Sequence, residues 1–122
     1  METQVRIYRE RYQGLPERFV KKIDHDLGYL LEKKIPGLRQ IFLFGSCARG
    51  QVRSTSDVDL LIVTEEKLAD RRLAAEIRWT LDEAENGVRT DVVYQNQREP
   101  APKSVFQKVL ERDKKLILEV VD

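Results

Sequence analysis

Three aspartates, Asp57, Asp59 and Asp91, are the residues of this sequence best suited to carry out chemistry. Asp57 and Asp59 stand one residue apart at the start of the apolar run VDLLIV, and because side chains alternate along a strand, they point to the same side. Asp91 lies in a second run, RTDVVY, where a buried, unpaired charge would be costly. If the two strands are neighbours, the sequence predicts a three-carboxylate site for Mg²⁺, which prefers oxygen ligands.

Each half of this site also has a simpler explanation. A D-x-D pair is common at the exposed end of a strand, where water screens the repulsion between the two carboxylates. Asp91 could likewise begin its strand at the solvent edge. These alternatives stay open as long as the aspartates are considered by themselves.

A Gly-Ser pair before the aspartates favours the site. Gly45 allows a sharp turn and a close approach of backbone N–H groups to an anion, and Ser46 adds a hydroxyl group. Arg49 and Arg53 follow and could neutralise phosphate charge. A Gly-Ser pair alone indicates only a turn, but at this spacing before D-V-D it predicts a site for phosphate and metal together.

The segment FGSCARGQVRSTSDVDLLIV closely resembles the signature of the DNA polymerase beta-type nucleotidyltransferases, especially of the minimal, single-domain branch called MNT. The matching parts include Gly45-Ser46, the Ala-Arg-Gly that follows, and Ser56 before the first aspartate. The similarity extends over nearly the whole chain. It implies an enzyme that transfers NMP, AMP from ATP, to an acceptor hydroxyl and releases pyrophosphate.

The resemblance also implies a role for each residue of the motif. Asp57, Asp59 and Asp91 would be the catalytic residues and would hold two Mg²⁺ ions. The other motif residues would bind the nucleotide: Gly45 and Ser46 the β- and γ-phosphates, with Arg49 in support.

The acceptor is implied by the habits of the family. Minimal members commonly occur beside a helical HEPN protein, often an RNase toxin, and act as antitoxins by adding AMP to one of its tyrosines. Two alternatives remain: an antitoxin that binds and occludes its partner without turnover, and a nucleotidyltransferase acting on a small molecule or an RNA end. A pure binder has no reason to keep three mutually repelling carboxylates, which argues against occlusion.

Hydrophobic periodicity predicts the elements that must position these residues. We expect one α+β domain over residues 1–122, with a small mixed β-sheet, helices packed on one face and, by resemblance, the polymerase beta-type fold. The expected helices are 16–34, 67–85 and 103–112, the expected strands are 39–44, 58–63 and 88–94, and a short polar helical arm fills 1–14. Periodicity does not decide whether 115–121 is a strand or a helix.

Composition argues against several classes of protein. A net charge of +1 gives no field for direct nucleic-acid binding, although basic residues in the N-terminal third form either a solvated helix face or a binding surface. The chain has neither an apolar run of about 18 residues nor an apolar stretch near its start, so we expect no membrane association. A single cysteine, Cys47, excludes an internal disulfide and favours the cytoplasm.

Three further residues have less certain meaning in the sequence. Trp79 lies opposite the apolar stripe of its helix, so it belongs either to an interface or to a core between two layers. Cys47 occupies a variable position of the motif and is assigned no redox or nucleophilic role, and His25, between two aspartates, is expected on the surface. The sequence leaves the oligomeric state open.

Overall fold

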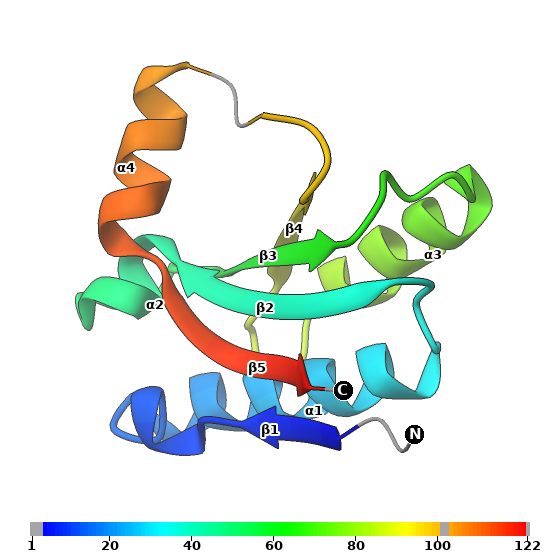
Figure 1. Cartoon of the computed structure of the whole chain (residues 1–122). Helices are drawn as coiled ribbons and strands as arrows, with labels where there is room; N and C mark the ends of the chain where they lie inside the picture. Colours follow the sequence, from blue (N-terminus) through cyan, green and yellow to red (C-terminus); the bar gives the residue numbers. More distant parts are fainter. Residues whose placement is uncertain (1–3, 101–102, 122) are drawn as a thin grey trace.

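A five-stranded mixed sheet forms the centre of the protein (Figure 1). The computed structural model describes residues 4–100 and 103–121. The sheet has the order β1-β5-β2-β3-β4, and among its neighbouring strands β3 and β4 are parallel whereas the other pairs are antiparallel. The strands are β1 (Gln4–Ile7), β2 (Leu38–Phe44), β3 (Val58–Thr64), β4 (Thr90–Asn96) and β5 (Lys115–Val121). The predicted α+β class with a mixed sheet is confirmed.

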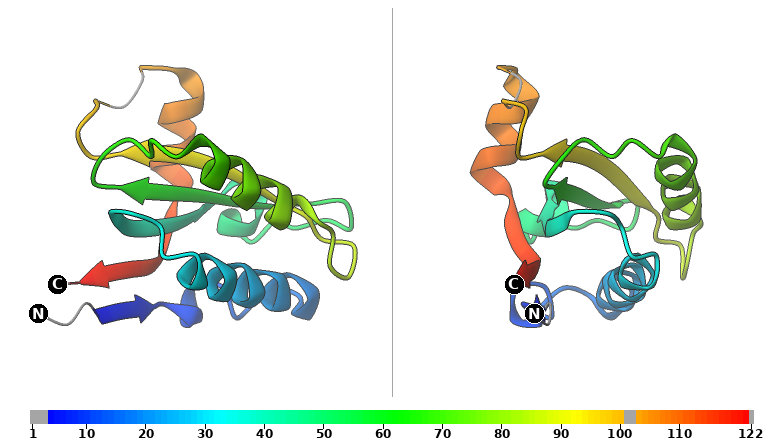
Figure 2. Two further views of the ribbon diagram at one scale, coloured as in Figure 1. Left: turned by 90° about the vertical axis from the view of Figure 1, so that its right-hand side faces the viewer. Right: turned by 45° about the vertical axis from the view of Figure 1, so that its right-hand side comes forward.

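Helices cover both faces of this sheet, but unequally. They are α1 (Glu17–Glu32), α2 (Gly45–Arg49), α3 (Arg71–Asp82) and α4 (Val105–Asp113), with a short 3₁₀ helix η1 over Arg9–Arg11. Helices α1 and α3 lie together on one face, as predicted (Figure 2), and enclose the main core with β2 and β3. Helix α4 packs on the opposite face, where Leu110 is buried against Phe44, Leu61 and Val63, so the prediction that the helices share one face is wrong for this helix. No described helix has both the length and the apolar character that a membrane span requires.

Side-chain caps fix the starts of two helices. The carboxylate of Asp70 accepts a hydrogen bond of 3.0 Å from the backbone N–H of Leu73, so α3 begins later than the predicted residue 67. The hydroxyl of Ser104 accepts a bond of 3.0 Å from the N–H of Gln107 and begins α4 in the same way. The cap therefore sets the boundary more sharply than periodicity can.

The N-terminal arm differs from the prediction. Residues 4–7 form strand β1, which pairs antiparallel with β5 at the edge of the sheet, so the prediction of a helical arm is wrong there. The physical reason is that β5 offers unpaired backbone groups that a neighbouring strand satisfies. Residues 115–121 are thereby settled as a strand.

Trp79 is one of the most exposed apolar side chains of the described chain. It lies on α3 with 85% of its surface accessible, while Ile77 and Leu81 of the same helix are buried. The alternative of a core residue is therefore wrong. The side chain remains available to a partner.

Candidate active site

Strand pairing brings the three aspartates to one place. In the parallel register of β3 and β4, Asp59 lies directly opposite Asp91. Asp57 precedes β3 by one residue, and its period-two relation to Asp59 places both on the same side. This side is the face that carries α4, since Leu61 and Val63 continue the same alternation toward Leu110.

Gly45, directly after the neighbouring strand β2, lies against the carboxylate of Asp59. The antiparallel register of β2 and β3 pairs Phe44 with Asp59, so the next residue turns into α2 beside the aspartate. Gly45 has a φ of +71°, in the left-handed region that favours glycine, and a methyl group there would overlap the carboxylate oxygen Oδ2 of Asp59. Both the turn and the close approach therefore require glycine at this position.

The carboxylates influence one another electrostatically. Burial, followed by the charges of Asp91 and Asp57, raises the pKa of Asp59 to about 6, while the guanidinium of Arg49 acts in the opposite direction. Within residues 4–100 and 103–121, none of the three carboxylates has a hydrogen-bond or salt-bridge partner on another side chain. Apart from the long-range effect of Arg49, no positive side chain pairs with these oxygens in the described part of the chain.

The family of the chain follows from a match over most of this architecture. A family model described as a nucleotidyltransferase domain matches residues 28–117, a span that runs from α1 to β5 and includes all three aspartates. The chain belongs to this family.

Solved structures of nucleotidyltransferases show the same fold. A minimal nucleotidyltransferase is 28% identical, with a TM-score of 0.51 over 87% of this chain and 93% of that one. A chain of a toxin-antitoxin complex, MntA-HpeT in a mutant form, is 26% identical, with a TM-score of 0.53 over 77% of this chain and 70% of that one. No curated protein matches.

We expect nucleotidyl transfer to depend on the close approach of Gly45 to Asp59, and Gly45→Ala tests this prediction. The added methyl group would push the Asp59 carboxylate aside, and because a displacement near 1 Å can cost two orders of magnitude in rate, we expect transfer to fall by about 100-fold. Gly50→Ala is the matched control, since Gly50 also has a left-handed φ, +69°, but nothing lies within 4 Å of its methyl position. Both variants should lose about 1–2 kcal/mol of stability from backbone strain.

Steady-state transfer rates and thermal unfolding of the two variants separate contact from strain. Equal loss of activity in both would show that strain, and not the approach to Asp59, explains the need for Gly45.

Two of the three predicted nucleotide-binding residues, Ser46 and Arg49, line a shared hollow, and Gly45 is not among its lining residues. Its lining is polar and basic, formed by Ser46, Arg49, Gln51, Val52, Arg53 and Ser56. Arg49 is already engaged, because its Nη1 lies 3.1 Å from Oδ2 of Asp113 on α4. This pair joins α2 to α4, and Arg112 together with Arg49 holds the pKa of Asp113 below its usual value.

Asp113 was missed by sequence reasoning. It lies 64 residues beyond Arg49, outside the motif, and no spacing rule connects the two. Arg49 therefore has both a structural contact and a place beside the hollow, and nucleotide would compete with Asp113 for its guanidinium.

The three carboxylates offer the oxygen ligands that suit Mg²⁺, although they do not already surround one metal position. In the part of the chain that the structure describes, no three His, Cys, Asp or Glu side chains form a preformed metal cluster. Burial, followed by the charges of Asp91 and Asp57, nevertheless raises the pKa of Asp59. Three carboxylates without a salt-bridge partner fit a hard divalent ion, which binds oxygen and also accepts phosphate and water.

Cys47 and His25 take no part in this site. The Cys47 thiol is buried, and burial with the charges of Asp59 and Asp57 raises its pKa to about 12, so the reactive thiolate is suppressed. His25 is half exposed on α1 and pairs with Glu85 at 3.3 Å. The surface position expected for His25 is thereby confirmed.

Proposed function

We propose that the protein is a Mg²⁺-dependent nucleotidyltransferase that transfers AMP from ATP to a hydroxyl group of a partner protein. The observation that carries this proposal is the register of β3 and β4, which sets Asp91 opposite Asp59 beside the Gly45 turn. In this proposal, residues 1–122 form a single nucleotidyltransferase domain.

The chain's own residues would divide the work of transfer. Gly45 and Ser46 would hold the β- and γ-phosphates, with Arg49 in support, and Ser46 and Arg49 line the hollow beside them. Asp57 and Asp59 would hold Mg²⁺, and Asp91 would complete the site on the acceptor side. Bound metal would neutralise charge on the attacking and leaving oxygens. Positioned in line, the acceptor oxygen would bond to the α-phosphorus while the bond from that phosphorus to the α,β-bridging oxygen breaks. Pyrophosphate would leave, and Asp91 would accept the hydroxyl proton.

The proposed acceptor is a tyrosine of a HEPN-type toxin, which would make the protein an antitoxin. The similarity to a chain of the MntA-HpeT toxin-antitoxin complex supports this partner. The exposed Trp79 offers a contact residue of the kind enriched at protein interfaces. Modification of the toxin would then inactivate it.

The experiment is a transfer assay with the protein and the HEPN-type protein that co-purifies with it. Each α-labelled NTP is added with Mg²⁺, and the label is located by mass spectrometry. We expect label from ATP on a partner tyrosine, and Asp57→Ala should lower its transfer by about 10²- to 10³-fold or more, because the transition-state charge loses its stabilising metal. Asp82→Ala, which removes another exposed aspartate at the end of α3, should transfer normally.

Other outcomes of this assay decide between the alternatives. Label on RNA or on a small molecule would replace the protein acceptor while keeping the enzyme. Tight binding of the partner with no label from any NTP would leave an occluding antitoxin. Undiminished transfer by Asp57→Ala would remove the metal assignment.

A further inference from the structure

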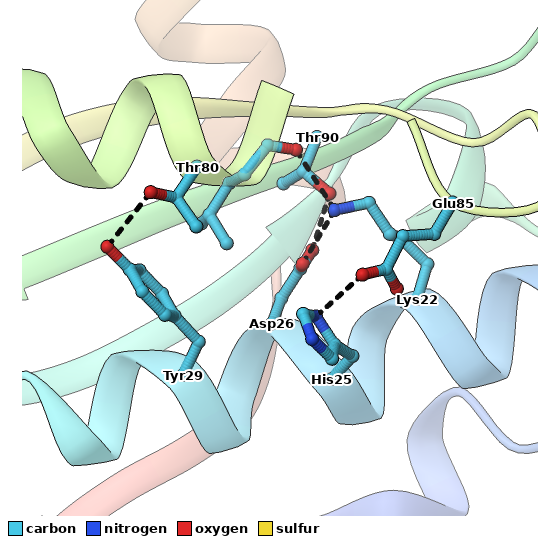
Figure 3. Close-up of polar contacts among 8 residues, drawn as sticks. Lys22, His25, Asp26, Tyr29, Thr80, Glu85 and Thr90 are labelled. Carbon is cyan, nitrogen blue, oxygen red and sulfur yellow. Dashed lines mark hydrogen bonds and ion pairs between the residues drawn. The ribbon is translucent and has the colours of Figure 1, made fainter. Parts of the chain in front are cut away.

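A buried ion pair lies between α1 and the two elements beside it. Lys22 and Asp26 are one helical turn apart, with side chains only 1% and 0% exposed. Nζ of Lys22 donates to Oδ1 of Asp26 at 2.7 Å and to the backbone carbonyl of Leu81, at the end of α3, at 3.0 Å (Figure 3). Because a buried ion pair rarely stabilises a core better than apolar side chains of similar size, the pair calls for another reason.

The second oxygen of the Asp26 carboxylate points to that reason. It accepts a hydrogen bond from the hydroxyl of Thr90, the first residue of β4 and itself only 1% exposed (Figure 3). The Asp26 carboxylate therefore holds Thr90 from the α1 side of the sheet, and Lys22 in turn fixes this carboxylate. A valine would fill the same space, but it could not make this bond.

Thr90 directly precedes Asp91, and the two side chains leave the strand on opposite faces. The hydroxyl of Thr90 faces α1, while Asp91 faces the site beside Asp59. Anchoring Thr90 therefore also fixes how far Asp91 stands from the sheet and how its side chain is rotated about the strand axis.

Strand β4 needs such an anchor at this point. It is an edge strand, so β3 alone pairs with its backbone in the sheet. Across residues 4–100 and 103–121, the Asp91 side chain has no hydrogen bond or salt bridge that could fix its position. The start of β4 is held by its parallel pairing with β3, which begins at Val58 and Thr90, and by the backbone bond from Val58 N–H to the Arg89 carbonyl, 2.9 Å. On the α1 side of the sheet, the Thr90 hydroxyl bond adds a side-chain anchor.

We propose that Lys22, Asp26 and Thr90 are positioning residues that hold Asp91 opposite Asp59 for metal binding and transfer. The proposal rests on the proposed function, because it concerns the geometry of that site. It assigns the buried polar network to the reaction and not to the stability of the core.

Thr90→Val is the sharpest test, because it removes the hydroxyl and keeps the volume of the side chain. Partners behind metal-binding residues commonly contribute 10- to 100-fold to affinity or activity, so we expect Mn²⁺ binding, measured by electron paramagnetic resonance without nucleotide, to weaken by about tenfold or more. The kcat of transfer should fall to a similar degree, while KM for the nucleotide stays within about twofold. Thr90→Ser, which restores the hydroxyl, should recover both Mn²⁺ binding and kcat.

The matched control is Thr64→Val at the far end of β3. Thr64 is also buried, 2% exposed, and its hydroxyl donates to the Glu66 carbonyl at 2.6 Å. This variant should lose comparable thermal stability and keep wild-type Mn²⁺ affinity. Equal loss of Mn²⁺ binding in both valine variants, or none in Thr90→Val, would overturn the positioning role.

The Mn²⁺ measurement separates this proposal from the proposed function. A wild-type protein that binds Mn²⁺ without transferring any nucleotide would contradict the function alone, and the Thr90 variants would still decide the positioning role by their Mn²⁺ affinity. A wild-type protein that does not bind Mn²⁺ would contradict both.

Discussion

Asp59→Asn is expected to stabilise the metal-free protein at pH 8 while it abolishes transfer. Burial, with the charges of Asp91 and Asp57, raises the pKa of this carboxyl from 3.8 to about 6. The folded protein therefore binds this proton more tightly than the unfolded chain, and above pH 6 it carries a charge that folding disfavours. Asparagine removes the charge at nearly constant volume. We expect a gain of about 2 kcal/mol, after a discount for partial exposure of the side chain.

The raised pKa of Asp59 determines how the stability difference between Asp59→Asn and the wild type depends on pH. Below about pH 4 the carboxyl is protonated in both states, so the variant and the wild type should have equal stability. As pH rises from 4 to 6, the unfolded state loses the proton first, and the wild type loses stability relative to the variant. Above pH 6 the difference should be constant.

Urea unfolding at pH 4 to 8 in the presence of EDTA measures this difference through the midpoint of the transition. Asp82→Asn, on the exposed end of α3, is the control and should show no such pH dependence. Added Mg²⁺ should stabilise the wild type and not Asp59→Asn, since the ion binds only to the folded site. Equal stability of the two proteins at pH 8 in EDTA would show that neither burial nor the neighbouring carboxylates destabilise the charged form of Asp59.

Much of the site was predictable because few rules determine it. The period of two along a strand places Asp57 and Asp59 on one side, and the parallel pairing of two β-branched runs brings Asp91 to them. The need for Gly45 follows from the register of β2 against β3, which the sequence did not specify. Asp113 was not predictable, since a contact across 64 residues depends on where α4 docks.

The docking of α4 and the fold of the N-terminal arm were decided by tertiary structure. Val5 and Ile7 alternate with polar residues, which is a strand pattern, but all four residues of β1 are exposed, so burial gave the pattern little support. The strand exists because β5 pairs with it. Propensity over four residues is too weak to predict such an edge strand.

The charges of Lys22 and Asp26 suggest surface positions, whereas their spacing along α1 places them on its buried face. The buried positions of α1 include 19, 22, 23, 26, 27 and 30, the spacing of a single helix face. The two charged residues therefore stand within the apolar stripe, although an i, i+4 ion pair usually lies on the surface. A charged residue within the apolar face of a helix is the sequence signal that would have indicated this network.

Lys22→Met is expected to be the most destabilising change in this network. It leaves the Asp26 carboxylate buried with Thr90 alone, and breaking a buried pair in this way costs about 3–5 kcal/mol. Burial raises the pKa of Asp26, and loss of Lys22 raises it further, so protonation relieves part of the cost as pH falls. The destabilisation should therefore be larger at pH 8 than at pH 5.

Chemical denaturation of Lys22→Met and of its neighbour Lys21→Met tests this prediction. Lys21 pairs with Glu17 at 3.2 Å, but both side chains are largely exposed, so its loss should change stability by less than about 0.5 kcal/mol. A small effect of Lys22→Met at pH 8 would mean that water reaches Asp26 in the folded protein.

The triple variant Lys22→Met, Asp26→Leu, Thr90→Val separates stability from function. It replaces all three polar side chains by apolar ones, so no charge or hydroxyl is left buried without a partner, although the Leu81 carbonyl loses its bond from Lys22. We expect stability within about 2 kcal/mol of the wild type. If the network serves only the core, this protein should also transfer nucleotide at the normal rate. A stable triple variant with slow transfer would show that the polar residues are kept because Asp91 must lie opposite Asp59.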